Sequence, residues 1–128
     1  MAKILIVDEE EKIREVIREY AEFSGYEVDE ACDGMDAVLK CRENKYDIII
    51  MDIMMPNMGG ETTLAKLKEN PNFNIPVIAL TADAVAGAKE KYLSEGFVDY
   101  IAKPFTKDQI KEKLDIMQML YHILNINK

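Results

Sequence analysis

The chain has 128 residues and a formal net charge of −8, with 48% hydrophobic and 31% charged residues. This length suits one domain and is too short for two ordinary ones, and the composition is typical of a globular protein. The acidic balance argues against nucleic acid as a direct ligand, because phosphate binding needs a basic surface. Neither a membrane-length apolar run nor a leader is visible, so we expect a cytoplasmic protein without a membrane-spanning segment.

The first half of the chain predicts two strands and two helices by its hydrophobic spacing. The segments are "KILIV" as strand, a helix from Ile13 that ends at Gly25, "YEVDEA" as strand and "DGMDAVLKC" as helix. Glycine is the residue expected just after a helix C-terminus. In the second helix we expect Met35, Val38 and Leu39 to be buried.

The second half continues the alternation of strands and helices. It contains the strand "YDIIIMD", a loop "IMMPNMGG", a helix marked by Leu64 and Leu67, the strand "IPVIALT", a helix over 83–95 stopped by Gly96, the strand "VDYIA" and a final helix opened by Thr106. Strand followed by helix, repeated five times, predicts an α/β doubly wound fold with parallel strands. The nearly continuous apolar runs fit strands that are covered on both faces.

Polar side chains stand at the ends of four predicted strands. Asp8 and Glu9 follow the first strand, Asp52 ends the third, Thr81 ends the fourth and Lys103 follows the fifth. In such folds ligands bind beyond the carboxyl ends of the strands, so we expect these side chains at one edge of the sheet. Helix capping could explain Asp8 alone, but it explains neither Thr81 nor Lys103.

The grouped acids predict a magnesium site with room for a phosphoryl group. Carboxylates held together repel one another, and a hard divalent cation with oxygen ligands relieves that repulsion. Lys103 adds positive charge, and the hydroxyl of Thr81 can donate to a phosphoryl oxygen. A carboxylate can attack phosphorus to give an acyl phosphate, and Asp52 at a rigid strand end suits that role. Cys32, Cys41 and His122 show no metal-ligand spacing, and we expect reduced structural thiols and an ordinary helix histidine.

Four segments together resemble the receiver domain of two-component response regulators. They are "KILIVDEEEKIREVI", "YDIIIMDIMMPNMGG", "PVIALTA" and "VDYIAKPF", and the similarity covers about residues 3–117. The resemblance implies a flavodoxin-like (βα)5 three-layer sandwich with strand order 2-1-3-4-5 in a single domain over 1–128. It leaves about 118–128 as an extension of the C-terminal helix.

The resemblance also implies a role for each matching residue. Asp52 matches the phosphoacceptor, which takes a phosphoryl group from a phosphohistidine. Asp8 and Glu9 match the acidic pair that holds Mg²⁺ together with Asp52, and the backbone carbonyl of Met54 matches a further ligand. Thr81 matches the switch hydroxyl.

The fifth strand carries the remaining family positions. Lys103 matches the lysine that contacts the phosphoryl group, and its bond to Pro104 is cis in the family. Tyr100 matches an aromatic residue that turns inward on activation. The chain departs from the common pattern at Glu9, where Asp is more usual, and at Gly59, where an acid is usual.

The implied partners are proteins. A sensor histidine kinase or a histidine phosphotransfer domain would donate the phosphoryl group, and a downstream target would bind the face formed by the fourth helix, fifth strand and fifth helix. The chain could be a stand-alone receiver or part of a hybrid histidine kinase. Extra apolar residues in the last helix leave three readings open: folding back on the domain, a homodimer contact, or a junction to another domain.

Other functions fit the sequence less well. A magnesium-dependent phosphatase with an aspartyl nucleophile would place a second Asp two residues after Asp52, where this chain has Met54. A flavodoxin-like electron carrier would need a Ser/Thr/Gly-rich loop where this chain has "DEEE". A degenerate receiver that acts only as a binding module would not need the intact set of site residues, which is Asp8, Glu9, Asp52, Thr81 and Lys103. We therefore expect a signalling domain rather than an enzyme, one that assists its own phosphorylation and slow dephosphorylation.

Overall fold

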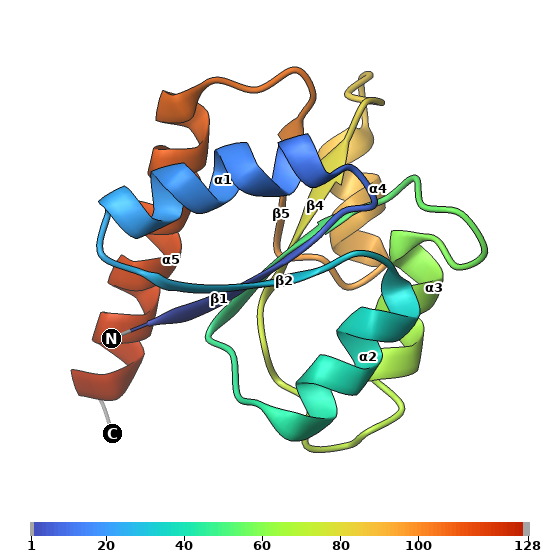
Figure 1. The fold of residues 1–128 in the computed structure, drawn as a ribbon, viewed down its shortest axis with the longest axis horizontal. Coiled ribbons are helices and arrows are strands. Elements are labelled where there is room, and N and C mark those ends of the chain that lie inside the picture. The colour runs from blue at the N-terminus through green and yellow to red at the C-terminus, as the bar shows by residue number, and fades with distance from the viewer. Residues whose placement is uncertain (1, 127–128) are drawn as a thin grey trace.

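The structure is a computed structural model that describes residues 2–126, without the side chains of 121 and 123–126. Within this range five strands alternate with five helices (Figure 1). The strands are β1 Lys3–Val7, β2 Glu27–Ala31, β3 Ile48–Asp52, β4 Val77–Thr81 and β5 Asp99–Ala102. The helices are α1 Glu11–Phe23, α2 Gly34–Glu43, α3 Gly60–Leu67, α4 Ala88–Ser94 and α5 Lys107–Ile126.

The strands form one parallel sheet in the order β2-β1-β3-β4-β5, which confirms the predicted fold class. Helices α1 and α5 cover one face of the sheet, and α2, α3 and α4 cover the other (Figure 1). Because β1 lies between β2 and β3, the chain winds outward in both directions from the middle of the sheet. The carboxyl ends of all five parallel strands consequently lie along one edge.

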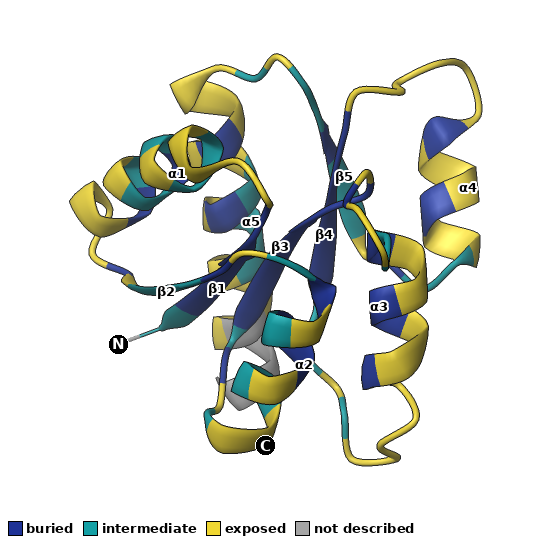
Figure 2. Cartoon of the chain, turned by 45° about the vertical axis from the view of Figure 1, so that its right-hand side comes forward, coloured by how far each residue is buried: buried dark blue, intermediate teal, exposed yellow. Residues whose placement is uncertain are grey.

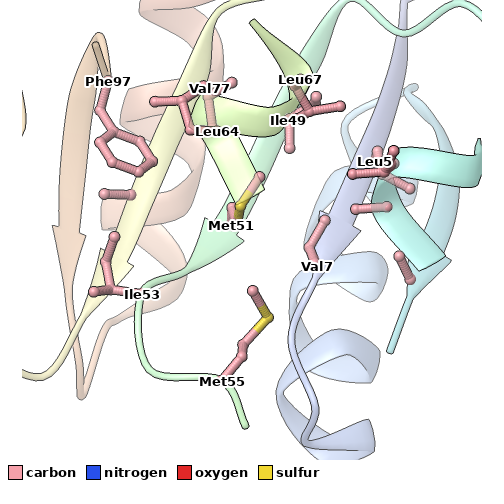
Figure 3. Close-up of a cluster of buried hydrophobic side chains, with 14 of the residues drawn as sticks. Leu5, Val7, Ile49, Met51, Ile53, Met55, Leu64, Leu67, Val77 and Phe97 are labelled. Carbon is pink, nitrogen blue, oxygen red and sulfur yellow. The ribbon is translucent and has the colours of Figure 1, made fainter. Parts of the chain in front are cut away.

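The hydrophobic core has two halves, one on each face of the sheet (Figure 2). Every residue of β3 and β4 is buried, as expected for inner strands covered on both sides. Figure 3 shows the half beneath α2, α3 and α4, where Met51 and Val77 from the sheet meet Leu64 and Phe97. These inner strands form a rigid base for the side chains at their carboxyl ends.

Several predicted helix ends are confirmed. Gly25 and Gly96 follow α1 and α4 with φ angles of 93° and 106°, a region that L-residues with side chains rarely adopt. At the start of α5, the backbone N–H of Gln109 donates to Thr106 Oγ1 over 3.2 Å, while the Thr106 N–H donates to Gln109 Oε1 over 2.8 Å. This reciprocal pair is a capping box, which satisfies two backbone donors at the helix start.

Two predictions about helices are wrong. Val38 of α2 is buried as predicted, but Met35 and Leu39 are 50% and 47% exposed, because the helix buries Gly34 and Ala37 in their place. Residues 83–87 form a loop, so α4 begins at Ala88 rather than at the start of the predicted range 83–95. Gly87 precedes the helix with a φ of 87°, which is outside helical geometry.

The last helix packs on the sheet through its first half. Ile110 and Leu114 are buried between the helix and the sheet, Met117 is half-buried, and Leu120 is 46% exposed. The extra apolar residues of this helix include Tyr121, Ile123 and Leu124, which lie outside the described side chains. The division at about residue 118 remains a prediction. No helix within residues 2–126 combines the length and apolar character that crossing a membrane requires.

Candidate functional site

The predicted site residues come from neighbouring strands that end at one edge. Val7 pairs with Met51, and Thr81 pairs with Ala102, so Asp8, Asp52, Thr81 and Lys103 all lie at the carboxyl end of the sheet. The backbone N–H of Lys103 donates to the carbonyl of Thr81 over 2.7 Å, which ties the end of β5 to the end of β4. Parallel pairing alone therefore gathers residues from four distant parts of the chain.

Lys103 joins the two buried acids. Its Nζ lies 3.1 Å from Asp8 Oδ2 and 3.2 Å from Asp52 Oδ1. Asp8 is fully buried and Asp52 is 4% exposed. Two carboxylates with one ammonium leave a net negative charge in a place where water screens it poorly. The arrangement brings Asp8, Asp52 and Lys103 together as the sequence predicted, with Lys103 in direct contact with both acids.

The pKa values respond to this crowding. Burial, followed by the negative charge of Asp8, raises the pKa of Asp52, while Lys103 and the backbone of Met54 act in the opposite direction without cancelling the shift. Burial alone would lower the pKa of Lys103, but its hydrogen bonds and ion pairs with Asp8 and Asp52 outweigh that effect and raise it. Lys103 is therefore positively charged at neutral pH, and the site retains an unbalanced carboxylate.

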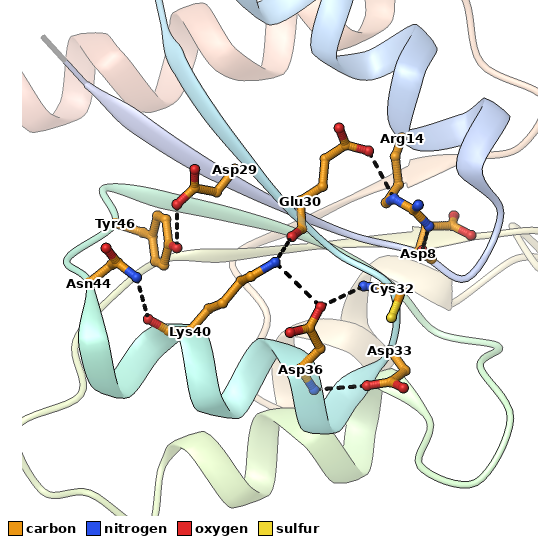
Figure 4. Close-up of polar contacts among 10 residues, drawn as sticks. All are labelled: Asp8, Arg14, Asp29, Glu30, Cys32, Asp33, Asp36, Lys40, Asn44 and Tyr46. Atoms are coloured by element: carbon orange, nitrogen blue, oxygen red, sulfur yellow. Dashed lines mark hydrogen bonds and ion pairs between the residues drawn. The ribbon is translucent and has the colours of Figure 1, made fainter.

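Asp8 is held in place by hydrogen bonds to its side chain and to its backbone carbonyl. The backbone N–H of Glu10 donates to Asp8 Oδ1 over 2.9 Å, and a guanidinium nitrogen of Arg14 donates to the Asp8 carbonyl over 2.7 Å (Figure 4). Sequence reasoning missed Arg14, although its position in the first turns of α1 brings it back over the end of β1. The neighbouring Glu9 is exposed, and its role as a magnesium ligand remains a prediction.

The loop after β3 passes close to Asp52. A Cβ atom on Gly60 would lie 2.5 Å from the Asp52 carbonyl oxygen, so only glycine allows this approach. The Gly60 N–H donates to the carbonyl of Ile53 over 3.0 Å, which closes the loop. The Met54 side chain points into solvent, with 74% of it exposed, and its proposed carbonyl contact with a metal remains a prediction.

Thr81 lies at the predicted edge, but its hydroxyl is bonded to the α4 side. The Asp83 N–H donates to Thr81 Oγ1 over 2.9 Å, and the Tyr92 hydroxyl lies 2.8 Å from the same atom. Among the described residues, this hydroxyl makes no hydrogen bond to Asp52 or Lys103. Sequence reasoning missed Tyr92, because no motif marks which partner a buried phenol will find.

Tyr100 is half-buried on β5, next to a surface hollow. Its ring lies 5.9 Å from that of Tyr92, at an angle of 43° between the ring planes. The hollow has a volume of about 310 Å³ and is lined by Lys89, Asp99, Tyr100, Ile101, Ala102, Gln109 and Lys113. Tyr100 thus contacts the buried ring of Tyr92 on one side. On the other side it reaches the outer face made by α4, β5 and α5. The Lys103–Pro104 peptide bond is cis, as the resemblance implied.

The donor set of the edge is compatible with a hard cation, although it is not a preformed metal cluster. Within the described residues, no three acidic, histidine or cysteine side chains are grouped closely enough to hold a metal ion by themselves. Asp8 and Asp52 supply carboxylate oxygens, which Mg²⁺ prefers, and it commonly completes its coordination with water and phosphate oxygens. The excess negative charge beside Lys103 is what a bound cation would neutralise.

Known proteins resemble this chain over most of its length. The family model for the response regulator receiver domain matches residues 4–115. The sensor protein EvgS of Escherichia coli strain K12 is 39% identical over 120 residues, which are 94% of this chain and 10% of EvgS. The chain thus spans only 10% of the length of EvgS and 44% of the length of another curated relative, the transcriptional regulatory protein ResD of Bacillus subtilis.

Solved structures share the fold. The receiver domain of the Francisella response regulator 1452 has a TM-score of 0.84 and 34% identity, covering 91% of this chain and 96% of its own. The response regulator TrrA of Thermotoga maritima, solved in complex with Mg²⁺ and BeF, has a TM-score of 0.78 and 33% identity. The match covers 91% of this chain and 99% of the TrrA chain. Family model, relatives and solved structures agree with the four motifs at the strand ends, and the chain belongs to the response regulator receiver domain family of two-component systems.

Proposed function

We propose that Asp52 accepts a phosphoryl group from a phosphohistidine and that the phosphorylated domain signals to a partner protein. The observation that carries this proposal is the pair of contacts from Lys103 Nζ, 3.1 Å to Asp8 and 3.2 Å to Asp52. A buried carboxylate at a rigid strand end, beside a fixed ammonium and a second carboxylate, suits nucleophilic attack on phosphorus. The donor is a sensor histidine kinase or a histidine phosphotransfer domain.

In the transfer step, an oxygen of the Asp52 carboxylate forms a bond to phosphorus as the P–N bond of the phosphohistidine breaks. The imidazole nitrogen leaves with the electron pair of that bond and takes up a proton. The positively charged Nζ of Lys103 offsets negative charge on the transferred oxygens, which is the main demand of phosphoryl transfer. The domain thereby assists its own phosphorylation, and attack of water on the same acyl phosphate gives slow dephosphorylation.

Magnesium completes the proposed site. Asp8, Glu9, Asp52 and the carbonyl of Met54 would hold the ion, which supplies positive charge to the phosphoryl oxygens when bound. The net negative charge of the two buried acids with Lys103 supports this assignment. The related TrrA was solved in complex with Mg²⁺ and BeF, which fits a common chemistry at this edge.

Signalling would follow from a population shift between two conformations. A phosphoryl group on Asp52 adds charge and acceptor oxygens, which can draw the Thr81 hydroxyl toward it. Tyr100 then turns inward, and the face formed by α4, β5 and α5 changes shape for a downstream protein in the cytoplasm.

The phosphatase alternative is weaker, because the position two residues after Asp52 is an exposed Met54, whose thioether cannot transfer a proton. A binding module without phosphorylation is also weaker, since it gives no reason for two buried acids to meet Lys103. Burying such charges is costly when no chemistry or binding uses them.

Intact-mass spectrometry after incubation with Mg²⁺ and phosphoramidate tests the proposal. The wild-type protein should gain the mass of one phosphoryl group, and Asp52→Asn should gain none. Asp47→Asn is the matched control, because Asp47 precedes the same strand at its other end, where it accepts from the Lys3 N–H over 2.7 Å. No gain in the wild type, or an undiminished gain in Asp52→Asn, would refute the assignment, while multiple turnover on phosphate esters would point to the phosphatase.

A further inference from the structure

Tyr92 is a buried residue of α4 that makes the shortest side-chain hydrogen bond to Thr81. The side chain is 2% exposed, and its hydroxyl oxygen lies 2.8 Å from Thr81 Oγ1. Thr81 itself is 1% exposed, so water does not reach this pair freely. A phenol buried this deeply normally requires a hydrogen-bond partner, and here that partner is the residue expected to sense the phosphoryl group.

The hydrogen bonds around Thr81 form a closed set. Its Oγ1 accepts from the Asp83 N–H over 2.9 Å, and the carbonyl of Asp83 lies 3.4 Å from Thr81 Oγ1 and 3.5 Å from the Tyr92 hydroxyl. Whichever of the two hydroxyls donates to the other, the remaining hydroxyl proton can reach this carbonyl. All of these partners belong to the β4–α4 loop and to α4, so they hold the Thr81 hydroxyl away from Asp52.

A phosphoryl group on Asp52 would compete with Tyr92 for the same hydroxyl. Thr81 has one hydroxyl proton to donate, and donating it to a phosphoryl oxygen requires a different side-chain orientation. The Tyr92 phenol would then lose its shortest hydrogen bond while still buried, which opposes the change. The strength of this bond consequently contributes to the resting population of the domain.

The Tyr92 ring also connects Thr81 to the outer face. It packs edge-on against Phe97 with the ring centroids 6.0 Å apart, and at 43° against Tyr100 with the centroids 5.9 Å apart. Aromatic rings at these separations interact favourably, so a shift of one ring disturbs its neighbours. A movement that begins at the Thr81 hydroxyl therefore has a direct path through one side chain to Tyr100.

We propose that Tyr92 is a positioning residue of the switch: its phenol holds the Thr81 hydroxyl in the resting orientation and releases it when a phosphoryl group occupies Asp52. The inference rests on the proposed function, because it assumes that Thr81 binds that group. It assigns the resting conformation to a particular hydrogen bond, and it makes Tyr92 the link between Thr81 and Tyr100.

The test is the affinity for beryllofluoride, a phosphoryl mimic, in the presence of Mg²⁺. Tyr92→Phe removes the hydroxyl and retains the ring packed against Phe97 and Tyr100. Because one opposing hydrogen bond is lost, the variant should bind beryllofluoride roughly two- to tenfold more tightly than the wild type. In a Thr81→Ala background, the same substitution should leave the affinity unchanged, since the bond is already absent.

Tyr46→Phe is the matched control. Tyr46 is also a buried tyrosine, 5% exposed, and it belongs to the same half of the core as Tyr92. Its hydroxyl donates over 2.7 Å to Oδ2 of Asp29 on β2, at the edge of the sheet opposite β5. Both substitutions remove one phenol hydrogen bond, so both are expected to change stability, but only Tyr92→Phe should change beryllofluoride affinity. A merely structural role for Tyr92 predicts equal affinities in the two variants.

A measurement on the wild-type chain needs no substitution at all. With tyrosines carrying ¹³C at the ring ζ carbon, the Tyr92 signal should shift in step with beryllofluoride binding, while the Tyr46 signal should stay fixed. A wild type that binds beryllofluoride with an unmoved Tyr92 signal, or a Tyr92→Phe affinity at or below that of the wild type, would overturn the role of Tyr92 alone. A wild type that binds no beryllofluoride would overturn the proposed function and this inference together.

Discussion

Two pairs of acids on the same sheet have opposite electrostatic surroundings. Asp8 and Asp52 are buried at the carboxyl edge, and both contact the single ammonium of Lys103. Asp29 and Glu30 lie on the edge strand β2, where they are half-buried. We call the first group the central pair and the second the edge pair.

The edge pair has more cations than acids. Lys3 Nζ lies 3.3 Å from Asp29, and Arg14 and Arg18 each place a nitrogen 2.9 Å from a Glu30 carboxylate oxygen. Figure 4 shows the contact of Arg14 with Glu30 and two further hydrogen bonds: the Tyr46 hydroxyl donates to Asp29, and the Lys40 ammonium donates to the backbone carbonyl of Glu30. Charged side chains on an edge strand also discourage pairing with another chain.

The pKa values record the difference. Burial and the charge of Asp8 raise the pKa of Asp52, whereas the hydrogen bond from Tyr46, aided by Lys3, lowers the pKa of Asp29. A carboxylate with too little positive charge around it is available for a cation or a phosphoryl group, while a fully paired one only holds structure. The comparison therefore separates the acids that the proposed function uses from acids that are paired within the fold.

The largest expected effect comes from removing the cation of the central pair. Lys103→Met should lower the free energy of unfolding by about 3 kcal/mol at pH 7 without Mg²⁺, because two buried carboxylates lose their partner. Urea unfolding measures the loss. Lys113→Met is the control: it breaks a 2.8 Å pair with Asp99 whose side chains are 27% and 13% exposed, and should lose about 1 kcal/mol or less. Equal losses in the two variants would contradict the comparison.

Magnesium should stabilise the folded protein by binding at the central pair, and it should not bind at the edge pair. At a concentration ten times its dissociation constant, an ion that binds only the folded state adds about 1.4 kcal/mol to the free energy of unfolding. Thermal unfolding with increasing MgCl₂ should show this rise in the wild type and in Asp29→Asn. Asp8→Asn should lose most of it. A rise of the same size in Asp8→Asn would mean that the ion binds elsewhere.

Asp52→Asn should stabilise the protein by about 1 kcal/mol at pH 7 in the absence of Mg²⁺, since it removes repulsion with Asp8. The pKa of Asp52 is raised in the folded state, so the folded protein binds its proton more tightly than the unfolded chain does. Stability in the wild type therefore falls as pH rises from the usual aspartate pKa of about 3.9 toward the higher folded value. The gain of the variant should therefore be larger at pH 7 than near pH 3, where Asp52 is protonated in both states, as urea unfolding at both values can determine.

The sequence was sufficient to predict the central pair. Parallel strands end at one edge, so a residue that closes a strand predicts its neighbours in space, and Asp8, Asp52 and Lys103 meet as expected. Helix burial was less predictable, because hydrophobicity alone does not tell which side of α2 faces the sheet. There the helix buries Ala37 and leaves Met35 exposed.

The partners of polar side chains were not predictable. The contacts of Arg14 with Asp8 and of Tyr92 with Thr81 join residues on different elements, and their formation depends on how far each helix stands from the sheet. The edge pair was missed for the same reason: "YEVDEA" reads as an alternating strand, but nothing in its letters shows that Lys3 and two arginines surround it. The end of a strand determines where the backbone places a side chain. A hydrogen bond also depends on the position of its partner on another element, which the sequence pattern does not give.

The smallest effect, and the one most specific to the edge pair, is expected for Asp29→Asn. The Asp29 side chain is 37% exposed and water screens its pair with Lys3, so the loss should be only about 0.5 kcal/mol at pH 7. Its pKa is lowered in the folded state, so this contribution is present above the usual aspartate pKa and is lost as pH falls through the folded value.

The sign of the Asp29→Asn change is therefore the decisive quantity. Urea unfolding of Asp29→Asn, Asp52→Asn and the double variant, at pH 7 and near pH 3, compares the two acids under one set of conditions. The single variants should shift stability in opposite directions at pH 7, and the double variant should give their sum, because the two sites share no partner. Stabilisation by Asp29→Asn would mean that the edge pair also carries unbalanced negative charge, and the distinction between the two pairs would then be lost.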